Sequence, residues 1–185
     1  MSDEEIYSPD EQRAFHLVGE FLGWFARLEA VIDRSIIDLL ELEPTTGQLL
    51  MTYLNFSSKC TILQELASAD GVGLSTEERR EAKNAIGKIR KLADTRNIIA
   101  HSMFSPSEAG IKFSSHGQKK IVSDRSTVIE ESEFRKNREI IAQSWSNIAS
   151  LAAQIKSKTR ERRIAEIVLQ TKLALVRAEP GSRPN

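Results

Sequence analysis

Hydrophobic residues recur at intervals of three and four positions along most of the chain, which is the spacing of helices that bury one face. The first such segment runs from Asp10 to Leu40 and stops before Pro44, a residue that continues a helix poorly. The second covers residues 49–69, and we expect it to bend near residues 55–58. Both segments therefore predict helices with one apolar side.

Two further helical segments follow. Residues 75–104 open with Ser75 three positions before Glu78, a pair typical of a helix N-terminal capping box. Another helix is predicted from near Ser132, and after a charged stretch its amphipathic pattern resumes at Ile164. The chain therefore holds four to five predicted helices.

Between the last two helical segments the pattern changes to short β-leaning runs. Residues 111–113 and 120–122 flank a turn that contains Gly117, which favours a small hairpin within about residues 110–123.

These elements predict an all-α fold, an up-and-down bundle of four to five helices with a small β-hairpin insertion. A chain of 185 residues is long enough for one domain with a substantial core. We divide it into an acidic N-terminal lead (residues 1–14), the bundle (15–155), a C-terminal helical extension (156–178) and a disordered tail (179–185).

Composition narrows the classes of function without selecting one. The 26 basic and 26 acidic side chains cancel, so any nucleic-acid site must be local. The one cysteine, Cys60, leaves no internal disulfide or multi-cysteine metal site, and it is expected to pack in the core. No apolar run approaches the roughly 20 residues that span a bilayer, and the acidic start does not resemble a signal peptide. We therefore expect a cytoplasmic protein without membrane contact, cofactor or resident metal.

Residues 91–104 contain the candidate chemistry. At 100° per residue, Arg96 falls about 20° from the centre of an apolar stripe that runs from Ile89 to Met103. A guanidinium that faces a core is costly unless it is paired. Glu29 occupies a similar place on the first helix, so we expect Glu29 and Arg96 to meet, or nearly meet, at the mouth of the bundle.

Asn97 and His101 stand four residues apart at the edge of that stripe, and Asp94 shares their flank. Histidine exchanges protons near neutral pH, and arginine stabilises the negative charge of phosphate oxygens. With an asparagine to hold the phosphate or the imidazole, this set suits cleavage of RNA by its own 2′-hydroxyl without a metal. This reaction needs two proton carriers, and one chain supplies a single histidine of this kind. Ile98 is apolar and points to the far side of the helix, which indicates a further interface. A dimer formed through that interface would supply the second histidine.

The same residues also admit a structural interpretation. Arg96 would then be a core ion-pair residue, Asn97 a boundary polar group, and His101 a helix-end histidine favoured by the macrodipole. The residues alone leave both interpretations open.

The hexamer from Arg96 to His101, RNIIAH, resembles the defining motif of the HEPN superfamily. That motif is an arginine, usually followed by a polar residue, with a histidine four to six positions later. Asn97 fills the polar position.

The resemblance extends beyond the hexamer to about residues 15–151. Residues 22–36 resemble the first helix of the family, including its acidic residue at Glu29, and residues 56–66 resemble the second. Residues 88–104, followed by a hairpin and a further helix, are similar to one branch of the superfamily.

The resemblance implies an all-α domain that commonly dimerises with its arginine–histidine motifs facing each other. Many members are metal-independent ribonucleases of toxin–antitoxin, anti-phage or RNA-processing systems. Others are binding domains, and bacterial forms pair with an antitoxin or small nucleotidyltransferase. We therefore expect a homodimeric ribonuclease or ribonuclease-like toxin. The alternatives are a non-catalytic domain that binds nucleotide, RNA or a protein partner, and a purely structural helical interaction module.

The C-terminal extension carries a cluster of basic residues against one acid, Glu161. These five residues are Lys156, Lys158, Arg160, Arg162 and Arg163. They form either a local phosphate-binding strip or a solvated helix face. Trp24 and Trp145 are expected to be core or interface aromatics rather than platforms for base stacking.

Overall fold

The computed structural model describes residues 7–114 and 126–178, with side chains described as far as Thr171. Its described helices are α1 (Pro9–Leu39), α2 (Pro44–Tyr53), α3 (Phe56–Ser68), a short 3₁₀ helix η1 (Asp70–Val72), α4 (Thr76–His101) and α5 (Glu131–Ala178). Its described strands are β1 (Met103–Ser107), β2 (Gly110–Ser114) and β3 (Ser126–Ile129), which form one antiparallel sheet in the order β1-β2-β3.

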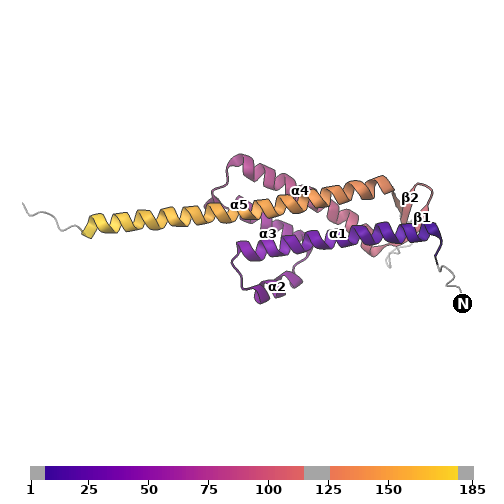
Figure 1. Ribbon diagram of the computed structural model, residues 1–185, viewed down its shortest axis with the longest axis horizontal. Coiled ribbons are helices and arrows are strands. Elements are labelled where there is room, and N and C mark those ends of the chain that lie inside the picture. The colour runs from indigo at the N-terminus through magenta and orange to yellow at the C-terminus, as the bar shows by residue number, and fades with distance from the viewer. Residues whose placement is uncertain (1–6, 115–125, 179–185) are drawn as a thin grey trace, which may run out of the picture.

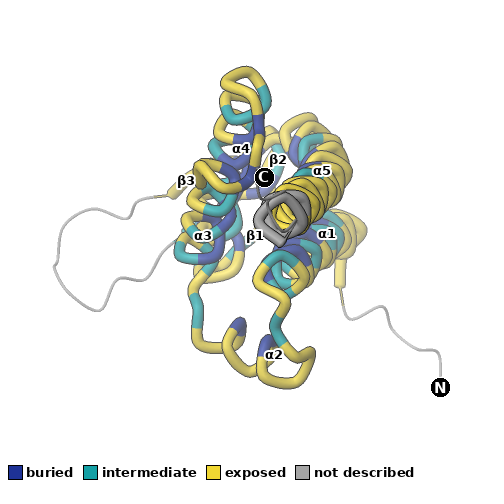
Figure 2. Tube along the Cα trace, turned by 90° about the vertical axis from the view of Figure 1, so that its left-hand side faces the viewer, coloured by how far each residue is buried: buried dark blue, intermediate teal, exposed yellow. Residues whose placement is uncertain are grey.

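The helices form an elongated bundle along α1 and α5, which lie side by side and run in the same direction, whereas α4 runs the opposite way (Figure 1). Buried positions face inward between α1, α3, α4 and α5 (Figure 2). The sheet lies at the end of the bundle where α1 begins. The predicted helical bundle with a small β insertion is confirmed at this coarse level, and none of the described helices is long and apolar enough to cross a bilayer.

The first helix agrees with its prediction and corrects the predicted N-terminal lead. Ser8 and Glu11 form a reciprocal capping box and Pro9 occupies the first turn, so the helix starts at Pro9. Ala14 is only 2% exposed, because it belongs to the same buried face as Val18 and the residues that follow. Residues 9–14 are therefore part of the bundle.

The predicted bend in the second segment is a complete break between two helices. Asn55 ends the α2–α3 connection, and its side-chain oxygen accepts a hydrogen bond of 2.8 Å from the backbone N–H of Ser58. At the other end of α2, a Cβ on Gly47 would lie 2.8 Å from Ile37. A glycine there lets α2 pack closely against α1.

The fourth helix ends earlier than predicted, and the strand pairing differs from the predicted hairpin. Residues 75–104 give a helix only as far as His101, because the backbone turns extended at Ser102 and Met103 enters β1. The strand predicted at residues 111–113 is confirmed in β2, which pairs with β1 and β3. Pro106 is tolerated in β1 because β1 is an edge strand. The predicted partner at residues 120–122 lies outside the described residues.

The predicted boundary at residues 155–156 falls inside one continuous helix, α5, which begins at Glu131. What changes near this point is packing. Ile148 and Ile155 are buried, whereas all described side chains from residue 160 to residue 171 are exposed. The extension is therefore the projecting end of α5 (Figure 1).

We predict that Gly110→Ala destabilises the fold by about 1–3 kcal/mol, because Gly110 has a φ of 144° and an added Cβ would lie 2.3 Å from the carbonyl oxygen of Ile129. Chemical denaturation measures this change. The control is Gly23→Ala in exposed helix, where no atom lies within 4 Å of an added Cβ, and a gain of up to about 1 kcal/mol is expected there. Equal stability of the two variants would contradict the proposed clash.

Candidate functional site

A pocket of about 630 Å³ opens between α1, the α2–α3 connection and α4. Four of the predicted site residues line it, namely Glu29, Asp94, Arg96 and Asn97. The helical spacing of α4 explains the grouping, because residues three and four apart share one side of a helix. We call this cavity the motif pocket.

Arg96 and Asn97 form the centre of the predicted motif. The Nη1 of Arg96 donates a hydrogen bond of 3.2 Å to Oδ1 of Asn97, and its Cζ lies 6.0 Å from the ring centroid of Phe25. This geometry orients the guanidinium over an aromatic face. His101 does not line the pocket. It is exposed at the end of α4, one turn beyond Asn97.

The expected ion pair between Glu29 and Arg96 is not formed, although both residues line the motif pocket. The Oε1 of Glu29 lies 2.9 Å from Nζ of Lys59, and Oδ1 of Asp33 lies 2.8 Å from the same nitrogen. Lys59 is 4% exposed, so its buried ammonium needs these two carboxylates more than the guanidinium of Arg96 needs them.

Lys59 was not among the predicted site residues, although its position carried a signal. It lies four residues before Leu63 and next to Cys60, both of which are buried. Apolar periodicity therefore places Lys59 on the inner face of α3, where a charge needs partners. Glu29 and Asp33, four residues apart on α1, are the partners that this reasoning would have sought.

Protonation within this cluster is unequal. Burial opposes the charge of Lys59, but the hydrogen bonds and charges of Asp33 and Glu29 outweigh that cost and raise the pKa of Lys59. Burial is the largest influence on Asp33 and raises its pKa, Glu29 adds to the rise, and the hydrogen bond and charge of Lys59 act in the opposite direction. The ionised form of Asp33 is therefore disfavoured.

The motif pocket also contains residues that the motif did not predict. The rings of Phe25 and Phe56 form an aromatic pair with centroids 4.8 Å apart. Arg90 donates to the Thr61 hydroxyl at 2.9 Å, while its buried Nε has no partner among the described residues.

The charge balance of the motif pocket favours an anionic ligand. Arg90, Lys91 and Arg96 line it together with two carboxylates, Glu29 and Asp94. Lys59 carries one charge against the two of Glu29 and Asp33, so the four cations in and beside the pocket exceed the three carboxylates by one. Phe25 is 2% exposed, so the aromatic pair is part of the packed wall, and the cations are the groups that suit a phosphate.

Cys60 packs in the core as expected. It is 1% exposed, and burial raises the pKa of its thiol to about 11 although the neighbouring Arg90 acts in the opposite direction. The thiol is therefore protonated at neutral pH and is not a nucleophile of the pocket.

The basic residues of the extension are largely engaged with protein groups. Lys158 contacts both carboxylate oxygens of Glu78 at 2.9 and 2.8 Å. Arg162 donates to Glu166 and to the backbone oxygen of Asp70, and Arg163 donates to Glu41. Lys156 lines a separate groove, and Arg160 is exposed. The exposed ion pairs of Arg162 and Arg163 are weak, so the phosphate-binding strip and the solvated helix face both stay predictions for these five side chains.

Comparison of the chain with protein-family models, with curated proteins and with solved structures finds no match in any of the three.

We predict that Lys59→Met lowers the free energy of unfolding by about 3 kcal/mol, because it leaves two neighbouring carboxylates without their cation. The partial solvent access of both carboxylates places the loss at the lower end of the range for buried pairs. Asp33→Asn is the matched control and should cost less than about 1 kcal/mol, because that carboxylate is already disfavoured. Urea denaturation of both variants tests this ranking, and an equal loss would contradict it.

We also predict that Lys158→Met raises the pKa of Glu78. In the wild-type protein, hydrogen bonds first from Lys158 and then from Ser75 lower this pKa to about 2. Since the folded-state pKa lies below the ordinary value, this contact stabilises the fold above pH 4.5 and is lost as the pH falls toward 2. NMR titration of the side-chain carboxyl groups measures the change. The control is Glu43, whose pKa is lowered to about 2 by the backbone of Thr45 and Thr46 and should not move.

Proposed function

We propose that the protein is a metal-independent endoribonuclease of the HEPN type, acting as a ribonuclease-like toxin or defence protein with a composite site at a homodimer interface. One observation carries this proposal. Arg96 and Asn97 are hydrogen-bonded to each other at the mouth of a cationic pocket, with His101 exposed one turn further along α4.

The proposed reaction is attack of a ribose 2′-hydroxyl on the adjacent phosphate. A base removes the hydroxyl proton, an acid protonates the departing 5′-oxygen, and a cyclic phosphate forms. Arg96 would stabilise the negative charge that builds on the phosphate oxygens, and Asn97 would hold the guanidinium in place. His101 would carry one of the two protons.

A second copy of the chain would supply the second imidazole. Ile98 is 37% exposed although it is apolar, and it lies on α4 between Asn97 and His101. Pairing of two α4 C-terminal ends would cover Ile98 and bring two copies of the motif to one cleft. The proposed dimer therefore follows from the need for two proton carriers.

A second candidate is a non-catalytic domain that binds a nucleotide, RNA or a protein partner through the motif pocket. It is favoured by the position of His101, which does not line that pocket. Arg90, Lys91 and Arg96 support binding of a phosphate without any proton transfer.

Ribonuclease assays in the presence of EDTA test the first proposal. We expect wild-type protein to cleave single-stranded RNA, and His101→Ala to lose about 100-fold or more, which is typical for removal of a general acid or base. The control is His16→Ala, an exposed histidine of α1, which should retain full activity.

The second candidate predicts a different pattern. None of the proteins would cleave RNA, Arg96→Ala would abolish binding of a fluorescent RNA, and His101→Ala would leave binding intact. Cleavage that persists in His101→Ala after repurification would overturn the catalytic assignment.

A further inference from the structure

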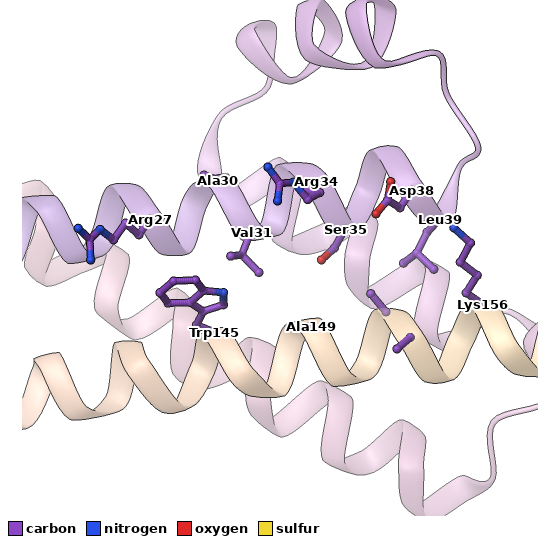
Figure 3. Close-up of a pocket in the computed structure, with 12 residues that line it drawn as sticks. Arg27, Ala30, Val31, Arg34, Ser35, Asp38, Leu39, Trp145, Ala149 and Lys156 are labelled. Carbon is purple, nitrogen blue, oxygen red and sulfur yellow. The ribbon is translucent and has the colours of Figure 1, made fainter.

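A second cavity, a groove of about 590 Å³, lies between α1 and α5 and shares no lining residue with the motif pocket (Figure 3). Along α1 it extends from Arg27 to Leu39, a length of about 18 Å at the helical rise. Its volume lies within the range of pockets that hold small organic ligands. No residue of the predicted HEPN motif takes part in it.

The floor of the groove is apolar. Trp145 rises from α5 toward Val31 of α1 (Figure 3), and it keeps 39% of its surface exposed. Ala149 and Ala152 continue the floor along α5. Because alanine side chains are short, α1 and α5 leave open space here that larger residues would fill.

Arg27 lies over the Trp24 ring, with its Cζ 5.2 Å from the ring centroid, whereas other polar groups of the groove have no partner among the described residues. Ser35 is 6% exposed, its hydroxyl points toward α5 (Figure 3), and it makes no hydrogen bond to another described residue. Because this hydroxyl opens onto the groove, it is available to donate a hydrogen bond to an oxygen of a ligand. Arg34 and Lys156 also line the groove, and within the described part of the chain neither forms an ion pair.

The charged residues of the groove favour a ligand with a negative charge. Three cations, Arg27, Arg34 and Lys156, line the groove against one carboxylate, Asp38. The projecting end of α5 from a second copy is a poor occupant, because residues 160–178 contain five basic and two acidic side chains. Like charges would oppose that contact.

We propose that this groove binds a small amphipathic anion, such as an alkyl or aromatic carboxylate. Its apolar body lies over Val31, Trp145 and the alanines, and its anionic head accepts hydrogen bonds from Ser35 and Arg34 or pairs with Lys156. This site is separate from the motif pocket, so it does not depend on the ribonuclease proposal.

The test uses decanoate as the probe and Trp24→Phe as the background, which leaves Trp145 as the one tryptophan of the chain. We expect a saturable change in Trp145 fluorescence and matching heat by calorimetry. Decyltrimethylammonium, with the same chain and the opposite charge, should bind roughly tenfold more weakly or worse. Equal binding of the two probes, or no binding of decanoate, overturns the proposal.

Variants locate the site. Ala152→Leu should abolish decanoate binding by filling the floor, whereas Ala165→Leu, on an exposed part of α5, should leave it unchanged. Ser35→Ala and Arg34→Gln should each weaken decanoate binding severalfold and leave the weaker binding of decyltrimethylammonium unaffected. Circular dichroism of each variant confirms folding. Unchanged decanoate affinity in a folded Ala152→Leu protein overturns the assignment to this groove.

Discussion

The motif pocket depends on a buried ammonium group. Lys59 extends from α3 between Glu29 and Asp33 of α1, and the cost of leaving such a charge unpaired fixes how α3 sits on α1. That placement brings Phe56, three residues earlier on α3, against the ring of Phe25. One wall of the pocket therefore exists because two carboxylates on α1 must reach one cation on α3.

The first helix serves two cavities with two different faces. Glu29 and Phe25 line the motif pocket, while Arg34 and Ser35 line the groove against α5. The apolar positions between them belong to the core, where Leu28 and Ile32 are fully buried. Few residues of α1 can be substituted without affecting either the core packing or one of the two cavities. Experiments on α1 variants therefore need to measure stability as well as binding at both cavities.

Local pattern was sufficient for the helices and insufficient for the contacts between them. The capping pair of Ser75 and Glu78 located the start of α4 because both residues lie within one turn. The partners of Lys59 and Lys158 lie tens of residues away in the sequence, and periodicity carries no information about such distances. The edge strand that contains Pro106 was missed because proline is read as a stop signal, although an unpaired strand edge tolerates it. Arg96 and Asn97 line the same cavity because α4 keeps regular geometry through the motif, and their catalytic role stays a prediction.

The chemistry of Cys60 makes the molecule convenient for site-directed labelling. As the one sulfhydryl of the chain, shielded and protonated at neutral pH, it should react sluggishly with maleimides. A cysteine introduced at an exposed position outside the motif, such as Ala165, would then be the main site of attachment for a dye or spin label. Spectroscopic distances between two such labels would report directly on how copies of this chain associate, with the native thiol left in place.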